Sequence, residues 1–386
     1  MKFYGYRRSD GRVGVRNHVV VIPGVLCSSG AAEKIARKVE GTMFVYNPHG
    51  CAQTSADSAI TTEIISGLIA NGNVYGALIV GLGCEQIQKD TYLSAIRKKT
   101  DKPVFYISIQ DLGGVRKTIE KGIEIASRLV EEASSCQRTE CDISELILGL
   151  ECGGSDPTSG ISSNVVLGKA VDVLIDAGGT AVLAETPEAI GAEDILKSRG
   201  STPEVGQKMY DMVKRCEKMF FDYGQDVRKS NPSPGNIKSG ITTLEEKSLG
   251  CVHKSGTRPF NAAIEYGEMI NCRGLVFMDG TAYDVASVVS LVAGGAQVVA
   301  FTTGCGTPVG NPIAPVIKIT GNRETFIKLN DMIDFDTSGS ISGEMSIDEL
   351  SEKLLDYIIE VCNGEPVKAE INEMFEMAIN QFGSYV

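Results

Sequence analysis

The feature of this sequence that most constrains its fold is a repeated local order: a short apolar run, a glycine turn, and then a stretch with helical periodicity. The apolar runs are "HVVVIPG" (18–24), "GALIVGLG" (76–83), "PVFYISI" (103–109), "ELILGLECGG" (145–154), "TAVLAE" (180–185), "GLVFMDG" (274–280) and "QVVAFTTG" (297–304). Short, evenly apolar strands that alternate with helices are typical of parallel sheets covered by helices on both faces. The sequence therefore predicts an α/β fold of two or three lobes, with mainly parallel sheets flanked by helices and Rossmann-like strand–helix units.

Two stretches rich in polar and turn residues divide this pattern. The polar spacer "SSCQRTECDIS" (134–144) predicts a boundary between an N-terminal α/β lobe, residues 1–140, and a C-terminal α/β region, residues 141–386. The stretch "SNPSPGNIKSGITTLEEKSLG" (230–250) is long for a loop, and loops of that length are usually functional or belong to an interface. A second domain boundary near residues 230–272 therefore stays an alternative.

The formal net charge of −12 narrows the classes of partner. A strongly acidic surface repels nucleic-acid phosphates and anionic lipids, so we expect neither nucleic acid nor a membrane as a partner. No apolar run reaches the roughly 18 residues of a membrane span, and the start "MKFYGYRRSDGRVG" lacks the apolar stretch of a signal peptide. We expect a cytoplasmic protein whose 11 cysteines are reduced.

Three of the glycine turns carry a cysteine: Cys51 in "PHGCAQ", Cys84 in "GLGCEQ" and Cys152 in "ECGGSD". Ligands of open α/β sheets bind beyond the carboxyl ends of the strands, which is where these turns lie. Three thiolates can hold an iron–sulfur cluster and leave one iron open for a substrate. The long separations give no C-x-x-C signature, so three structural thiols remain the alternative.

His49 precedes Cys51 in "NPHGCAQ", where the expected strand "TMFVY" (42–46) gives way to the expected helix "SAITTEIISGLIANG" (58–72). Beside a candidate metal-binding thiol it can serve as a ligand or as an acid or base. The alternative is a turn histidine that only bonds the backbone.

Two glycine-rich turns need comparison with dinucleotide-binding loops. "GCGTPVG" (304–310) has proline where a helix N-terminus should donate N–H groups, and "GLGCEQ" has only the first two glycines. The fold is therefore expected to be Rossmann-like without binding a nucleotide.

The longer motifs resemble, in order, those of the altronate/galactarate dehydratase family, over nearly the whole chain. They are "GYRRSDGRVGVRN", "HGCAQ", "GLGCE", "CGGSDPTSGISSN", "GGTAVLAETPE", "NPSPGNIKSGITTLEEKS", "FTTGCGTPVGNPIAPVIKITGN" and "MIDFDTSGSISGE".

The resemblance implies a hydro-lyase that removes water from a sugar acid, with altronate and its product 2-keto-3-deoxygluconate as the first expectation. A galactarate dehydratase and the large subunit of (2R)-sulfolactate sulfo-lyase are the alternatives in the same family. A noncatalytic subunit, whose cysteines only fill the core, is the alternative from another class.

The resemblance also implies a metal and a partner. We expect a [4Fe-4S] cluster with one open iron on Cys51, Cys84 and Cys152, with Fe²⁺ or Mn²⁺ as the alternative; Cys305 and His49 are possible additional ligands. Single-chain relatives carry a SAF-type domain before "GYRR", where this chain begins. A separate SAF-domain small subunit is therefore expected, and a homo-oligomer is also possible.

The reaction assigns roles to residues in or near these motifs. The base that removes the proton next to the carboxylate is expected to be His49, or Lys254 if burial lowers its pKa. The substrate carboxylate needs cationic donors, and the candidates are Arg16, Lys254, Arg258 and Lys318. Other candidate contacts are Ser155, Asp156, Ser159, Asn236, Glu245 and Lys247, and Glu85 is expected to orient the centre. For these side chains, helix capping or loop ordering is the alternative role.

Overall fold

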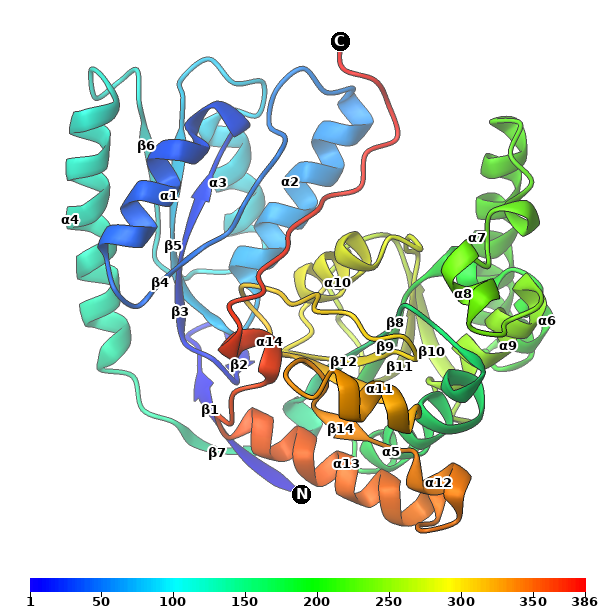
Figure 1. The fold of residues 1–386 in the computed structure, drawn as a ribbon. Helices are drawn as coiled ribbons and strands as arrows, with labels where there is room; N and C mark the ends of the chain where they lie inside the picture. Colours follow the sequence, from blue (N-terminus) through cyan, green and yellow to red (C-terminus); the bar gives the residue numbers. More distant parts are fainter.

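The computed structural model describes residues 1–386 and confirms the predicted α/β fold (Figure 1). The N-terminal lobe contains a four-stranded parallel sheet in the order β4-β3-β5-β6. Its strands are β3 (His18–Pro23), β4 (Thr42–Phe44), β5 (Val74–Gly81) and β6 (Val104–Ser108). Apolar residues of α1 (Ser29–Lys38) and α4 (Val115–Ser134) cover one face, and those of α2 (Ser55–Ala70) and α3 (Lys89–Arg97) cover the other.

The C-terminal lobe contains a seven-stranded parallel sheet in the order β10-β11-β9-β8-β12-β13-β14. Its strands are β8 (Ile147–Cys152), β9 (Thr180–Leu183), β10 (Phe260–Ile264), β11 (Gly274–Met278), β12 (Val298–Thr302), β13 (Val316–Thr320) and β14 (Phe335–Asp336). Strands β9, β11 and β12 are buried along their whole length, and β8 is buried after its first residue, which explains why they are continuous apolar runs in the sequence.

Helices cover both faces of this sheet. One face packs against α5 (Asn164–Asp176), α7 (Pro203–Asp222) and α13 (Ile347–Cys362). The other faces α10 (Asp284–Ala293) and, beyond it, α2 of the N-terminal lobe. Short helices complete the lobe: α6 (Glu193–Ser198), α8 (Pro234–Lys238), α9 (Leu244–His253), α11 (Arg323–Lys328) and α12 (Gly339–Ser342). None of the helices is long and apolar enough to cross a lipid bilayer.

The two lobes share one hydrophobic core. A single cluster joins Ile22 and Ile79 of the N-terminal sheet to Val276 and Val299 of the C-terminal sheet through α2 and α10. The two helices approach so closely that a Cβ added at Gly67 would lie 2.4 Å from the Ala293 carbonyl oxygen. Extensive burial therefore fixes the lobes against each other.

A small antiparallel sheet in the order β2-β1-β7 lies where the lobes meet. It consists of β1 (Lys2–Arg7), β2 (Val13–Gly14) and β7 (Thr139–Asp142). The polar spacer at 134–144 thus contains a strand, and its use as a domain boundary stays a prediction.

The C-terminal segment crosses from one lobe to the other. After α14 (Lys368–Ile371) the chain runs along α2 to the far end of the N-terminal lobe, shown in red in Figure 1. The backbone N–H groups of Phe382 and Gly383 donate to the Asp57 carboxylate, at 2.8 and 3.0 Å. The Val386 N–H donates to the Ala52 carbonyl at 2.9 Å. The tail is thus bonded to the loop that carries Cys51.

Candidate functional site

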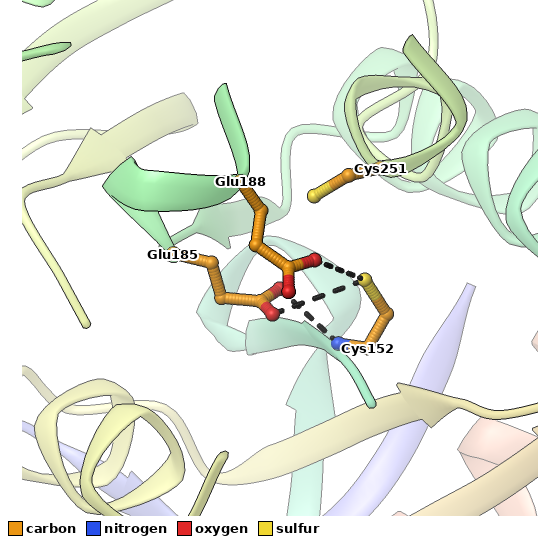
Figure 2. A group of neighbouring side chains, drawn as sticks. All are labelled: Cys152, Glu185, Glu188 and Cys251. Atoms are coloured by element: carbon orange, nitrogen blue, oxygen red, sulfur yellow. Dashed lines mark hydrogen bonds between the residues drawn. The ribbon is translucent and has the colours of Figure 1, made fainter. Parts of the chain in front are cut away.

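Four buried side chains converge at the carboxyl ends of β8 and β9. They are Cys152, Glu185, Glu188 and Cys251, and one sulfur or oxygen atom of each lies within 4.8 Å of the others (Figure 2). This four-residue group contains two soft thiols and two carboxylates. Such a donor set can hold a metal ion.

The sheet topology brings the group together. Cys152 ends β8 and Glu185 follows β9, and because these strands are parallel neighbours their carboxyl ends meet at one edge. Glu188 lies in the turn η4 (Thr186–Ala189), and Cys251 comes from α9.

Glu185 has a backbone φ of +72°, which is uncommon for any residue except glycine. Its carboxylate accepts a hydrogen bond from the Cys152 N–H at 3.2 Å. Strained backbone of this kind persists where the surroundings enforce it, often at functional sites.

Lys254 lies fully buried against three members of the group. Its Nζ donates to the Cys152 sulfur at 2.9 Å and the Cys251 sulfur at 3.2 Å, and it forms an ion pair with Glu185. Burial lowers the pKa of Lys254, but the two sulfurs and Glu185 outweigh it and raise that pKa well above its ordinary value. The condition set for Lys254 as a base, a lowered pKa, is therefore not met.

Carboxyl groups near Lys254 titrate at unusually high pH. Burial raises the pKa of Glu185 to about 7, despite the opposing charge of Lys254. Burial also raises the pKa of Asp284 to about 6 and that of Glu151 well above its ordinary value. The Glu151 Oε1 has no hydrogen-bond partner, while its Oε2 accepts from the Ser287 hydroxyl at 2.5 Å.

An open pocket of about 240 Å³ borders this group. Cys152, Cys251 and Lys247 form part of its wall, and Lys247 is ion-paired with Glu188. The pocket also contains the predicted substrate contacts Ser155, Asp156 and Ser159. Several of the predicted site residues are therefore neighbours, although they come from distant parts of the chain.

Some of these side chains also have structural roles. The Asp156 carboxylate accepts from the Ser159 N–H at 3.1 Å and from Asn322 at 2.8 Å, which is a helix-capping arrangement. Asn236 donates to the Ser155 carbonyl at 2.9 Å. Glu245 forms an ion pair with Arg228.

Cys51 and Cys84 are exposed and do not belong to the four-residue group. Their loops are bonded together: the Ile87 N–H donates to the Gly50 carbonyl at 3.1 Å, and Gln53 and Gln86 exchange two hydrogen bonds of 2.9 Å. A cluster that joins both thiols to Cys152 stays a prediction.

Glu85 orders the loop that carries Cys84. Its buried carboxylate accepts from the Leu82 N–H at 3.2 Å, from the Gly83 N–H at 2.5 Å and from the Tyr106 hydroxyl. Cys305 is exposed, and its sulfur lies 3.1 Å from the Ser239 hydroxyl.

His49 is buried, and its Nε2 lies 3.1 Å from the Ile379 carbonyl oxygen. Because a carbonyl oxygen only accepts, Nε2 carries the hydrogen in this contact. In the neutral ring the lone pair is therefore on Nδ1, which is buried without a hydrogen-bond partner.

None of the four cations predicted for the substrate carboxylate, Lys254 included, lines the pocket. Arg16 donates to both carboxylate oxygens of Glu370 at 2.8 Å and to backbone carbonyls, so it joins the N-terminal lobe to α14. Arg258 forms an exposed ion pair with Asp176. Lys318 is buried in β13 with its Nζ 5.6 Å from the Phe301 ring centre, and burial lowers its pKa to about 8. Their roles in substrate binding stay predictions.

The sequence analysis missed Glu185, Glu188 and Cys251. Two signals were present: Glu185 lies at the end of the predicted strand 180–185, as Cys152 lies near the end of 145–154, and Cys251 lies one helical turn before Lys254. The contact between α9 and the edge of the sheet could not be read from the sequence.

Two family models cover most of the chain. Residues 143–385 match "D-galactarate/Altronate dehydratase, C-terminal", and residues 5–134 match "D-galactarate dehydratase/Altronate hydrolase, second domain".

Curated relatives match over almost the full chain. It is 35% identical to the altronate dehydratase of Bacillus subtilis, over 99% of this chain and 78% of the relative. It is 36% identical to the (2R)-sulfolactate sulfo-lyase subunit beta of Chromohalobacter salexigens, over 95% of this chain and 94% of the relative. It is 31% identical to the galactarate dehydratase of Escherichia coli, over 94% of this chain and 73% of the relative.

Proposed function

Because the chain belongs to the D-galactarate/altronate dehydratase family, we propose that it is a metal-dependent hydro-lyase that dehydrates altronate to 2-keto-3-deoxygluconate. Membership of this family makes the chain an enzyme of the carbon–oxygen lyase class. Its relatives that are named altronate or galactarate dehydratase act on sugar acids. The observation that carries the proposal is the four-residue group beside a pocket that contains Ser155, Asp156 and Ser159.

The donor set fits a divalent transition metal. Two thiols and two carboxylates suit Fe²⁺ or Mn²⁺, and the Lys254 ammonium favours the deprotonated forms that bind metals. When bound, such an ion would act as a Lewis acid on the departing hydroxyl group. We favour a single ion over a [4Fe-4S] cluster because Cys51 and Cys84 lie outside the group; the cluster on Cys51, Cys84 and Cys152 is the alternative.

The protein side chains supply positive charge. Removal of the proton next to a carboxylate adds negative charge, and preorganised cations stabilise it by about 1.5–3 kcal/mol for each charge-assisted hydrogen bond. Lys247 is the pocket cation that we assign to the substrate carboxylate, and Lys254 stays positive beside the two sulfurs. The hydroxyl groups of Ser155 and Ser159 are assigned to the sugar hydroxyls.

His49 is our candidate for the proton acceptor. An imidazole nitrogen with a free lone pair can accept a proton, and Nδ1 of His49 is buried without a hydrogen-bond partner, although His49 itself does not line the pocket. We expect His49→Asn to lower kcat by about 10²–10⁴ with little change in the amount of bound metal. A variant with unchanged kcat would exclude this role.

Metal binding tests the centre directly. The chain is stripped with a chelator and titrated with Mn²⁺, with bound metal measured by equilibrium dialysis. We expect Glu188→Gln and Cys251→Ser to weaken binding by about tenfold or more, whereas Glu204→Gln and Cys272→Ser, exposed residues of the same types, leave it unchanged. Equal binding by all four variants would contradict the metal assignment.

Substrate assays test the reaction. The Mn²⁺- or Fe²⁺-loaded protein is offered altronate, galactarate and (2R)-sulfolactate, and the 2-keto product or released sulfite is measured. The second candidate is the sulfo-lyase subunit, which the 36% identity over 94% of that relative favours. Turnover of any of the three would exclude a noncatalytic subunit.

The relative named as a subunit beta also supports a partner. We propose that a small subunit with a SAF-type domain joins this chain, and that the chain itself can form a homo-oligomer. All 11 cysteines are unpaired, which suits a reducing compartment, so we propose a cytoplasmic location.

A further inference from the structure

Cys152 and Cys251 form a pair of buried thiols that opens onto the pocket. They are 1% and 3% exposed, and their sulfurs lie within 4.8 Å of each other. Both residues line the pocket, so a molecule of the size of water or peroxide can reach them. Such a pair can undergo chemistry that a single buried thiol cannot.

The surroundings make the two thiols unequal. The Lys254 ammonium lies 2.9 Å from the Cys152 sulfur and 3.2 Å from the Cys251 sulfur, and a cation at these distances stabilises a thiolate. The Cys152 sulfur also faces two carboxylates, Glu188 at 3.6 Å and Glu185 at 3.8 Å, whose negative charge opposes a thiolate on Cys152. We therefore assign the thiolate to Cys251.

We propose that Cys251 and Cys152 are a peroxide-reactive pair that closes into a reversible disulfide. The Cys251 thiolate attacks one oxygen of hydrogen peroxide; an S–O bond forms, the O–O bond breaks, and hydroxide leaves and is protonated to water. The Cys152 sulfur then attacks the sulfenic acid; an S–S bond forms, the S–O bond breaks, and a second water leaves with the Cys152 proton. Two thiols are oxidised and one peroxide is reduced to two waters.

Lys254 directs the second step to Cys152. A sulfenic acid can also condense with an amine, but Lys254 is held as an ammonium ion by its buried ion pair with Glu185 and has no lone pair for that attack. The product is therefore a disulfide, which a dithiol reductant reverses. Its formation removes both sulfur donors of the four-residue group. This step rests on the proposed metal-dependent function, in which the loss of both donors switches the site off.

Peptide mapping tests the pair without any variant. The metal-free full chain is treated with equimolar hydrogen peroxide, alkylated under denaturing conditions, digested and analysed by mass spectrometry. We expect a linked pair of peptides that contain Cys152 and Cys251, lighter than their sum by two hydrogen atoms, and its loss after treatment with dithiothreitol. The buried thiols of Cys216 and Cys362 in the same digest serve as internal controls and stay alkylatable.

A second measurement follows the intermediate. In Cys152→Ala the sulfenic acid on Cys251 has no thiol partner, so dimedone should label Cys251 in this variant and not in the parent chain. The proposal is overturned if Cys251 and Cys152 remain as alkylatable as Cys216, or if they are oxidised to sulfinic acid without a linked peptide. The outcome does not depend on metal binding, so failure here and failure of the Mn²⁺ titration are distinguishable.

Discussion

Glu185 combines a left-handed backbone with a buried carboxylate that is ion-paired with Lys254. Neither charge of this pair benefits stability unless the other is present, because each was removed from water to make the pair. Removal of one partner from a buried pair leaves the other charge uncompensated, whereas removal of both is often tolerated.

We therefore predict that Glu185→Gln lowers the free energy of unfolding by about 3–5 kcal/mol, and that Glu185→Gln combined with Lys254→Met recovers much of this loss. Urea denaturation followed by circular dichroism measures both values. Asp176→Asn, at the exposed pair with Arg258, is the control and should leave the unfolding midpoint unchanged. A double variant no more stable than the single one would contradict this account.

Lys318 gives a prediction about pH. Its pKa is about 8 in the folded protein, against 10.5 for the ordinary side chain, because it is buried and its ammonium has one hydrogen bond, to the Val316 carbonyl at 3.3 Å. Between pH 8 and 10.5 the unfolded chain binds more protons than the folded one, so stability rises with pH across this range. Below pH 8 the full cost of burying the ammonium is present.

Lys318→Met should therefore stabilise the fold at pH 7 by up to about 3 kcal/mol, with the gain gone by pH 10.5. Thermal or urea unfolding at several pH values measures this difference. A parallel activity assay tests the predicted role in carboxylate binding, because a residue that only fills the core can be replaced by Met without loss of turnover. A gain that does not change with pH would exclude the titration of Lys318 as its cause.

The loops after β4 and β5 act as one element because hydrogen bonds join them. Tyr106→Phe removes one bond to Glu85, the carboxylate that holds the Gly83 and Leu82 N–H groups. We predict about a fivefold faster amide exchange in residues 82–88, since one hydrogen bond contributes about 1 kcal/mol. Hydrogen exchange with mass spectrometry measures it. Tyr75→Phe, which loses a long surface contact of 3.4 Å to Glu132, should not change exchange in this loop.

Among the secondary-structure elements, the sequence predicted the buried strands and helices better than it predicted the small antiparallel sheet of β1 and β7. The expected strand at 42–46 and helix at 58–72 correspond to β4 and α2, because buried strands and an N-capped helix have local signals; Thr54 caps α2 through the Asp57 N–H. The sequences of β1 and β7 lack a continuous apolar run, so neither was predicted. Each forms a strand because it pairs with the other, and the residues of the N-terminal lobe separate the two in the sequence.

The candidate site was likewise predicted only in part, because some of its residues are brought together by contacts between distant segments. Ser155, Asp156, Ser159 and Lys247 were predicted and do line one pocket with Cys152. Glu185, Glu188 and Cys251 were not predicted, because their convergence depends on the packing of α9 against a turn far away in the sequence.

The whole molecule is one body because α2 and α10 pack between the two large sheets. We predict that Gly67→Ala destabilises the protein by about 1–3 kcal/mol, because its Cβ would lie 2.4 Å from the Ala293 carbonyl oxygen and force the helices apart. Gly30→Ala in α1 is the matched control: its Cβ meets open space, so the better helix propensity should make it neutral or slightly stabilising. Urea unfolding compares the two, and equal effects would contradict the interface account.

The tail that runs along α2 has a consequence for how the protein is made and handled. The loop around Cys51 is synthesised early, whereas Val386, whose N–H bonds the Ala52 carbonyl of that loop, is added much later. That loop therefore completes its hydrogen bonding only after Val386 has been synthesised. An affinity tag fused after Val386 would begin beside Ala52, one residue from Cys51, so a tag at the amino terminus is the safer choice for any experiment on this thiol.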